Sequence, residues 1–216
     1  MDILSVCKSE SGNEVTLKTD SGYFNISKAD YARFLKDYVG TADISEFEEH
    51  LPIFIPESAV NELEFFAEKL KAIKYAMYIL GIGDKSEKQL REKLKLKSYS
   101  PRACDEAISV LKKNEYISDE RYCARKCEIL ANTKLFGKYR IISKLFAKGI
   151  SRSLCERVLE ECEIDFEENL NTLFEKLTDG EIPETREQKK KISDKLLRYG
   201  YSYDEVSELF FRYGDY

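Results

Sequence analysis

Residues 141–162 read IISKLFAKGISRSLCERVLEEC, and the apolar positions in this stretch recur 51 residues earlier and 51 residues later. The recurring positions of the first copy are Leu90, Leu94, Tyr99, Ser100, Cys104, Ala107, Ile108 and Leu111. Their counterparts are Ile141, Leu145, Ile150, Ser151, Cys155, Val158, Leu159 and Cys162 in the second copy, and Ile192, Leu196, Tyr201, Ser202, Val206, Leu209, Phe210 and Tyr213 in the third. A period of this length indicates stacked supersecondary units, which usually form an interaction surface instead of a catalytic pocket.

Each copy carries the signals of two short helices that meet at a tight corner. Ser86 and Gln89 have the spacing of a capping box, and Ser202 and Glu205 repeat that box in the third copy. Ser100 precedes a proline at the first helical position, where the missing N–H costs nothing. A preceding helix completes each unit, and these helices are expected over residues 58–80, 120–131 and 166–177. The pattern therefore predicts tandem three-helix repeats, in three copies.

The N-terminal residues indicate strands. Apolar runs at residues 3–6, 15–17 and 23–26 are separated by turn clusters. A helix is expected over residues 27–39, followed over residues 43–56 by a polar connection with a short extended piece. We therefore expect a mainly α protein with a small N-terminal antiparallel β-meander plus helix. The expected domains are residues 1–57 (β-rich/α module), 58–119 (first repeat), 120–165 (second repeat) and 166–216 (third repeat).

The net charge of −5 conceals a strong segregation of charge along the chain. Residues 1–70 carry a net charge of −8, residues 71–160 carry +10, and residues 161–216 carry −7. A basic centre between acidic flanks is suited to nucleic acid or to an acidic protein groove. The alternative is that Lys and Arg side chains only solvate the helix faces.

Basic residues crowd the three copies and are the candidate contacts for such a partner. Lys93, Lys144 and Lys195 are equivalent at the offset of 51, and periodic cations of this kind could follow a phosphate backbone. The alternative is that one exposed helical position favours lysine. The candidate set is Lys88, Arg91, Lys93, Lys95, Lys97, Arg102, Lys138, Arg140, Lys144, Lys148, Arg152, Lys195 and Arg198.

No catalytic, cofactor-binding or metal site is predicted. His50 is the single histidine, so it cannot build a His-rich metal site, and its acidic surroundings favour a solvated surface position. Cys123 and Cys127 could share a metal, but no pair has CxxC spacing, and buried thiols are the favoured interpretation. The sequence has no P-loop, and Gly81 and Gly83 are expected to end a helix.

The chain is expected to be a cytoplasmic monomer with no membrane partner. No apolar run reaches the ~20 residues that a membrane span needs, and the N-terminal segment lacks the charged and apolar regions of a signal peptide. The six cysteines are then expected to be reduced and mostly buried.

Four segments resemble the elements of the RecX family. Residues 86–94 (SEKQLREKL) are similar to its "rSexELxxkL" element, residues 114–122 (NEYISDERY) to "xgylDDerfa", residues 137–151 (GKYRIISKLFAKGIS) to "GxxxIxxxLxxKGI", and residues 198–206 (RYGYSYDEV) to "RGFSxxxI". The elements come in the family's order, and the resemblance covers residues 70–216. The β-rich N-terminal segment resembles the extension of longer, Gram-positive-type members.

The resemblance implies a non-enzymatic regulator that binds the filament of the RecA recombinase. Members of the family are elongated, curved arrays of three-helix repeats that are proposed to lie in the helical groove of the filament. They restrain its ATP hydrolysis, strand exchange and co-protease activity, and thereby modulate recombinational repair and the SOS response.

A second hypothesis is a stand-alone DNA-binding helical module, whose basic central repeats contact single- or double-stranded DNA. The two functions can coexist, because a RecA filament presents both protein and DNA. An enzyme is disfavoured by the single histidine and by the lack of any nucleophile motif.

Overall fold

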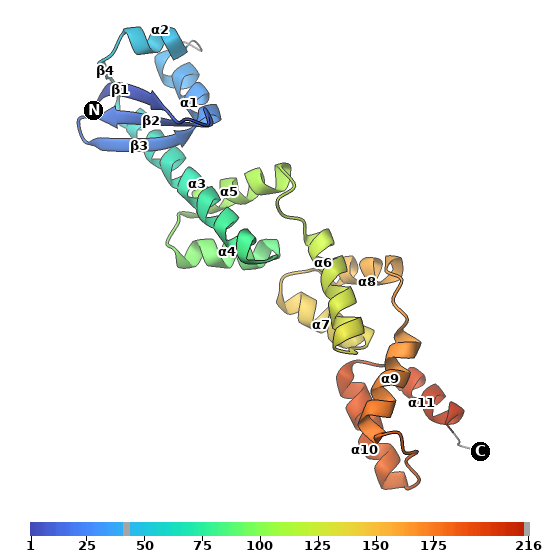
Figure 1. The fold of residues 1–216 in the computed structure, drawn as a ribbon. Coiled ribbons are helices and arrows are strands. Elements are labelled where there is room, and N and C mark those ends of the chain that lie inside the picture. The colour runs from blue at the N-terminus through green and yellow to red at the C-terminus, as the bar shows by residue number, and fades with distance from the viewer. Residues whose placement is uncertain (41–43, 214–216) are drawn as a thin grey trace. The chain divides into compact units, whose positions relative to one another are not determined.

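A computed structural model describes residues 1–40 and 44–213 of the chain. The chain forms two compact units, Met1–Asp84 with Leu90–Tyr116 and Lys85–Gln89 with Ile117–Tyr216. Most of the described residues lie in helices, and the strands form a small antiparallel sheet near the N-terminus (Figure 1). The expected fold class, mainly α with an N-terminal β-meander, is confirmed. Asp43 in the expected connection and residues 214–216 of the expected third repeat lie outside the described residues.

The apolar runs of the N-terminal segment pair as strands. The sheet, in the order β3-β2-β1-β4, consists of β1 (Asp2–Lys8), β2 (Glu14–Thr19), β3 (Gly22–Ser27) and β4 (Ile53–Phe54). Its inner face is covered by helices that begin with α1 (Lys28–Phe34), which continues as the π-helical turn η1 (Leu35–Val39). Ile3, Val15 and Leu17 are fully buried on that face. A sheet this small is not stable alone, so the helices provide the apolar surface that it needs.

Residues 44–49 form a helix within the segment expected to be a polar connection. This helix is α2 (Ile44–Glu49). Phe47 is only 1% exposed, and its ring meets that of Tyr31 edge-on with 6.2 Å between the ring centroids. This helix was not predicted, because two apolar residues, Ile44 and Phe47, in a short acidic segment are too few to establish a periodic pattern.

One continuous helix packs against both the sheet and the first repeat. α3 (Glu57–Ile82) leaves the sheet and runs on beside α5 (Pro101–Lys113), as Figure 1 shows. Leu63 of α3 and Ala103 of α5 belong to the same apolar cluster as the inner face of the sheet. The N-terminal module and the first repeat therefore share one core, and the expected domain bounds stay predictions.

The repeats follow in the order that the period predicts. Their remaining elements are α4 (Glu87–Leu96), α6 (Asp119–Glu128), the π-helical turn η2 (Ile129–Thr133), α7 (Lys138–Ala147), α8 (Arg152–Glu161), α9 (Phe166–Thr178), α10 (Arg186–Tyr199) and α11 (Tyr203–Arg212). Ser100, Ser151 and Ser202 precede α5, α8 and α11, and each hydroxyl accepts a hydrogen bond of 3.1–3.2 Å from the N–H three residues later. The recurring serine is thus a helix cap in all three copies.

The apolar positions of the period are the core positions of the repeats. Leu90, Ile141 and Ile192 are 0%, 0% and 7% exposed. Three further sets are also buried in every copy: Leu94, Leu145 and Leu196; Cys104, Cys155 and Val206; Ala107, Val158 and Leu209. The apolar positions that recur every 51 residues in the sequence are therefore the positions that are buried in the structure.

Within the second unit, the C-terminal end of a helix caps the N-terminal end of its counterpart in the preceding copy. The Lys148 carbonyl accepts a hydrogen bond from Ser86 Oγ at 2.5 Å. The Tyr199 carbonyl accepts one from the Gly137 N–H at 2.9 Å. Ser86 and Gly137 are 51 residues apart, and so are Lys148 and Tyr199, so the same junction occurs twice.

Glycine makes both junctions close. Gly149 and Gly200, again 51 residues apart, have φ values of 93° and 95°, which favour a residue without a side chain. A Cβ at Gly149 would overlap the side chain of Lys88, and a Cβ at Gly200 would overlap the backbone nitrogen of Arg140. The stacking of the copies therefore depends on glycine at the end of the helix.

Gly200→Ala tests this junction. Alanine at this φ costs about 1–2 kcal/mol of backbone strain, and the overlap with Arg140 is expected to cost about 1–3 kcal/mol more. Urea unfolding of the whole chain measures the loss. Gly180→Ala is the matched control, because Gly180 has a φ of 81° but open space around an added Cβ. Equal losses in the two variants would show that Gly200 makes no essential close contact.

Candidate interaction surface

Several candidate arginines are engaged within the fold. Arg102 donates to both carboxylate oxygens of Glu62, each at 3.0 Å, and its guanidinium lies 3.6 Å from the centre of the Phe65 ring. Arg91 forms an ion pair with Asp105. The planar guanidinium of Arg102 thus joins α5 to α3, and its role there is structural.

Arg140 has a similar structural role in the second unit. Its guanidinium donates to the Arg198 carbonyl at 2.7 Å and lies 4.2 Å from the centre of the Phe136 ring and 5.2 Å from that of Tyr199. Arg198 in turn donates from Nε to the Asp194 carbonyl at 3.1 Å. These contacts belong to the junction between α7 and α10, so Arg140 is poorly placed to bind a partner.

The candidate lysines point outward. Ten of the thirteen candidate cations are largely exposed: Lys88, Lys93, Lys95, Lys97, Arg102, Lys138, Lys144, Lys148, Arg152 and Arg198. Lys97, Lys138 and Lys144 each lie 5.2–5.4 Å from the centre of an aromatic ring. Within residues 1–40 and 44–213, the side-chain ammonium groups of Lys88, Lys93, Lys95, Lys148 and Lys195 make no hydrogen bond, ion pair or ring contact. Lys88, Lys93, Lys95 and Lys148 are also exposed, so they are the cations best placed to meet a partner.

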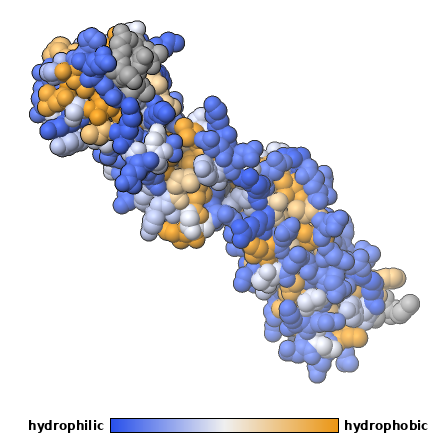
Figure 2. Space-filling view, turned by 45° about the horizontal axis from the view of Figure 1, so that its top comes forward, coloured by the Kyte–Doolittle hydropathy of each residue, from blue (hydrophilic) through white to orange (hydrophobic). Residues whose placement is uncertain are grey.

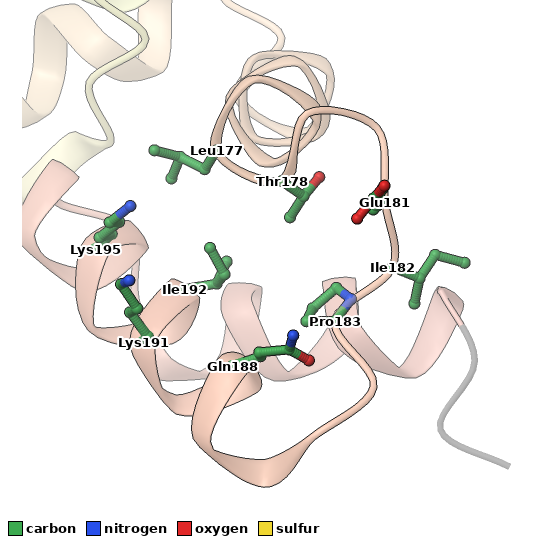
Figure 3. A pocket seen from close by; sticks show the side chains of 9 residues that line it. All are labelled: Leu177, Thr178, Glu181, Ile182, Pro183, Gln188, Lys191, Ile192 and Lys195. Carbon is green, nitrogen blue, oxygen red and sulfur yellow. The ribbon is translucent and has the colours of Figure 1, made fainter.

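The equivalent lysines Lys93, Lys144 and Lys195 do not all lie in the same surroundings. Lys93 and Lys144 are exposed, whereas Lys195 is half-buried. Lys195 and Lys191 line a pocket of about 190 Å³ between the end of α9, the following loop and α10 (Figure 3). In Figure 3 both lysines lie on the α10 side, and Leu177 lies across the pocket from them. The volume is below the ~300–1,000 Å³ of typical ligand pockets, so the pocket gives no support for a cofactor site.

The thiols of the second repeat form a buried cluster. Cys123 Sγ lies 3.9 Å from Cys127 Sγ and 3.7 Å from Cys155 Sγ, and all three side chains are fully buried. A hydrogen bond with Cys127, together with burial, raises the pKa of Cys123, and burial raises the pKa of Cys155 to about 12. In the described part of the chain, no group of three or more His, Cys, Asp and Glu side chains could hold a metal ion. Buried thiols in this environment act as packing residues.

The structure also exposes apolar residues that are not among the sequence candidates. Tyr139 and Phe146 on α7 are 60% and 65% exposed. On the face drawn in Figure 2, hydrophilic side chains cover most of the surface and hydrophobic side chains gather in separate patches. A comparison of the outer positions of the repeats, as well as of the inner ones, would have identified Tyr139 and Phe146.

None of the helices that the structure describes has both the length and the apolar character that a bilayer span requires.

The fold and its exposed lysines define a helical-repeat protein with candidate interaction residues in each of its two units. Residues 72–111 match the family model described as "RecX, first three-helix domain". The regulatory protein RecX of Actinobacillus pleuropneumoniae serotype 5b is 38% identical over 105 residues, which are 49% of this chain and 69% of that protein. The chain therefore belongs to the RecX family, whose members bear the name of regulatory proteins.

Two further relatives extend the comparison. The regulatory protein RecX of Cronobacter sakazakii is 28% identical over 145 residues, which are 62% of this chain and 87% of that protein. A crystal structure of a regulatory protein RecX has a TM-score of 0.71 and covers 98% of this chain and 100% of its own, at 19% sequence identity. Because the identity is only 19%, the similarity to this crystal structure concerns the fold alone. It covers nearly the whole chain, including the N-terminal module.

The burial of the thiol cluster predicts how fast each cysteine reacts with a thiol reagent. Cys7 is exposed, so a thiol-reactive disulfide reagent at about pH 8 should modify it rapidly. Cys123 and Cys155 are buried with raised pKa values, and they should react only as fast as the second repeat opens. The measurement is the time course of labelling, with peptide mapping. Cys7→Ser should remove the fast phase, and rapid labelling of Cys123 in the folded chain would contradict the packing role.

Proposed function

We propose that this protein binds the filament of a RecA recombinase and restrains its ATP hydrolysis, strand exchange and co-protease activity. Such a role would modulate recombinational repair and the SOS response. The observation that carries the proposal is the similarity to regulatory proteins of the RecX family, together with the match of residues 72–111 to the model of the family's first three-helix domain. RecA as the partner is what the family resemblance implies.

The chemistry of the described residues supports action by binding. Cys123 and Cys155 are buried and have raised pKa values, so they are poor nucleophiles. The pocket beside Lys195 is small. Outward lysines, by contrast, suit the carboxylates and phosphates that a nucleoprotein filament exposes.

The first experiment measures RecA-dependent ATP hydrolysis on single-stranded DNA. This protein, titrated from substoichiometric to comparable concentrations, should slow that hydrolysis. Replacing the equivalent lysines Lys93, Lys144 and Lys195 by Gln should raise the half-inhibitory concentration about tenfold, the effect of losing ~1.4 kcal/mol of binding free energy. No inhibition by the unmodified protein at any concentration would contradict the proposal.

The matched control changes three lysines of the N-terminal module. Lys18, Lys28 and Lys36 are exposed, and their replacement by Gln removes the same charge. This variant should inhibit like the unmodified protein. A comparable loss in both variants would assign the effect to net charge instead of to the repeats.

A second candidate function is direct binding to DNA. The observation in its favour is that the ammonium groups of Lys88, Lys93, Lys95, Lys148 and Lys195 form no ion pair with any described side chain. The test is the affinity for single-stranded DNA, without RecA, as a function of salt. Phosphate contacts predict a log–log slope of about −0.7 for each contact. Absence of binding, or an affinity that does not change with salt, would remove this candidate.

A further inference from the structure

The outer face of α7 interrupts the regularity of the repeat. The buried positions of α4, α7 and α10 are matched in all three copies, but three outer positions are not. At these positions the first copy has Lys88, Arg91 and Lys95, the second has Tyr139, Ile142 and Phe146, and the third has Lys190, Ser193 and Leu197. The same place on the same kind of helix therefore changes from cationic to apolar between the first and second copies.

The three apolar residues of α7 form one stripe. Their spacing of i, i+3 and i+7 places Tyr139, Ile142 and Phe146 on one side of the helix, and the stripe is about 10.5 Å long. Tyr139 is 60% exposed and Phe146 is 65% exposed, whereas Ile142 is partly buried. Single exposed apolar residues are common on protein surfaces. Two exposed aromatic rings on one stripe, where another copy has lysines, need a further reason.

The junction with α10 holds this stripe in place. The Tyr139 N–H donates to the Gly200 carbonyl at 3.2 Å, and the Gly137 N–H donates to the Tyr199 carbonyl. The start of α7 is therefore fixed before any partner binds, which reduces the entropy lost on association. Beside the stripe lie Ser143 and Ala147, which are exposed and small, so a partner surface can approach closely.

Cations border the stripe at both ends. Lys138 precedes Tyr139, and the Lys148 side chain is exposed just beyond Phe146. All the charged side chains of α7 itself are positive, namely those of Lys138, Arg140 and Lys144.

We propose that Tyr139, Ile142 and Phe146 dock into an apolar groove, bordered by carboxylates, on a protein partner. Anchors at i, i+3 and i+7 are the set that a helix presents when it lies in a hydrophobic groove, and the bordering lysines complement an acidic rim. The naming of RecA as that partner rests on the proposed function. Ile142 lies half-buried between the two exposed rings, so the stripe is continuously apolar, and an apolar groove on a protein is the surface that suits it.

The test replaces the stripe with the residues that the first copy carries. The double variant Tyr139→Lys with Phe146→Lys introduces the side chains found at the equivalent Lys88 and Lys95, so the repeat is expected to fold. Its half-inhibitory concentration for RecA-dependent ATP hydrolysis should rise about 30-fold, the size of effect seen when buried aromatic anchors are lost. Circular dichroism during heating checks the fold, and Tyr139→Ser with Phe146→Ser provides a second variant without added charge.

The matched control lies on α11. Tyr203 and Phe211 are 74% and 67% exposed, and Tyr203→Lys with Phe211→Lys makes the same chemical change in the same unit. This control should inhibit like the unmodified protein.

The outcomes separate the two proposals. If the unmodified protein inhibits and the α7 variants inhibit equally well, the docking surface is wrong while the proposed function stands. If the α7 lysine variant inhibits more strongly, the surface meets phosphates, and the protein groove is overturned. If the unmodified protein does not inhibit at all, the proposed function fails and the partner named here fails with it.

Discussion

The capping of one helix by the end of the next is the interaction on which the second unit depends. The carbonyls of Tyr199 and Gly200 at the end of α10 accept hydrogen bonds from the N–H groups that begin α7. The partial negative charge of one helix end thereby meets the partial positive charge of the other. The approach is possible only because Gly200 has no side chain. Since the junction between Ser86 and the end of α7 follows the same rule 51 residues earlier, a single geometric requirement sets how the copies stack within this unit.

The local parts of this arrangement can be predicted from the sequence, whereas the long-range parts cannot. The serine caps and the buried apolar positions lie within a turn or two of the helices that they specify, so periodicity and capping rules identify them. The junction pairs residues such as Gly137 and Tyr199, which are far apart in the chain and have no local signature. α2 was not predicted for a different reason, because Ile44 and Phe47 are its only apolar residues and the segment is short and acidic. The recurrence of glycine at Gly149 and Gly200, 51 residues apart, is a trace of the junction in the sequence.

The candidate surface was harder to predict, because Arg and Lys count equally in a tally of charge. In the structure, Arg102 and Arg140 use their planar guanidinium groups to join neighbouring elements, whereas Lys88, Lys93, Lys95 and Lys148 remain solvated. A guanidinium offers several directed donors and an apolar face, and an ammonium on a flexible stem offers neither. Some of the basic residues, Arg102 and Arg140, therefore have a structural role. The lysines remain the candidates for contact with a partner. Substituting the arginines would change the stacking of helices before it changed any contact with a partner.

A repeat protein must keep its buried positions alike, because neighbouring copies share one packing geometry, but its outer positions are free to differ. Because the outer positions are free to differ, the differences between them indicate what each copy is suited to bind. If each copy met an equivalent site on a regular filament, the outer faces of α4, α7 and α10 would be expected to resemble one another. Instead, α4 carries Lys88, Arg91 and Lys95 where α7 carries Tyr139, Ile142 and Phe146. Helices with the same buried positions but with different outer chemistry cannot all favour the same partner surface, so the copies of this chain are suited to different parts of their partner.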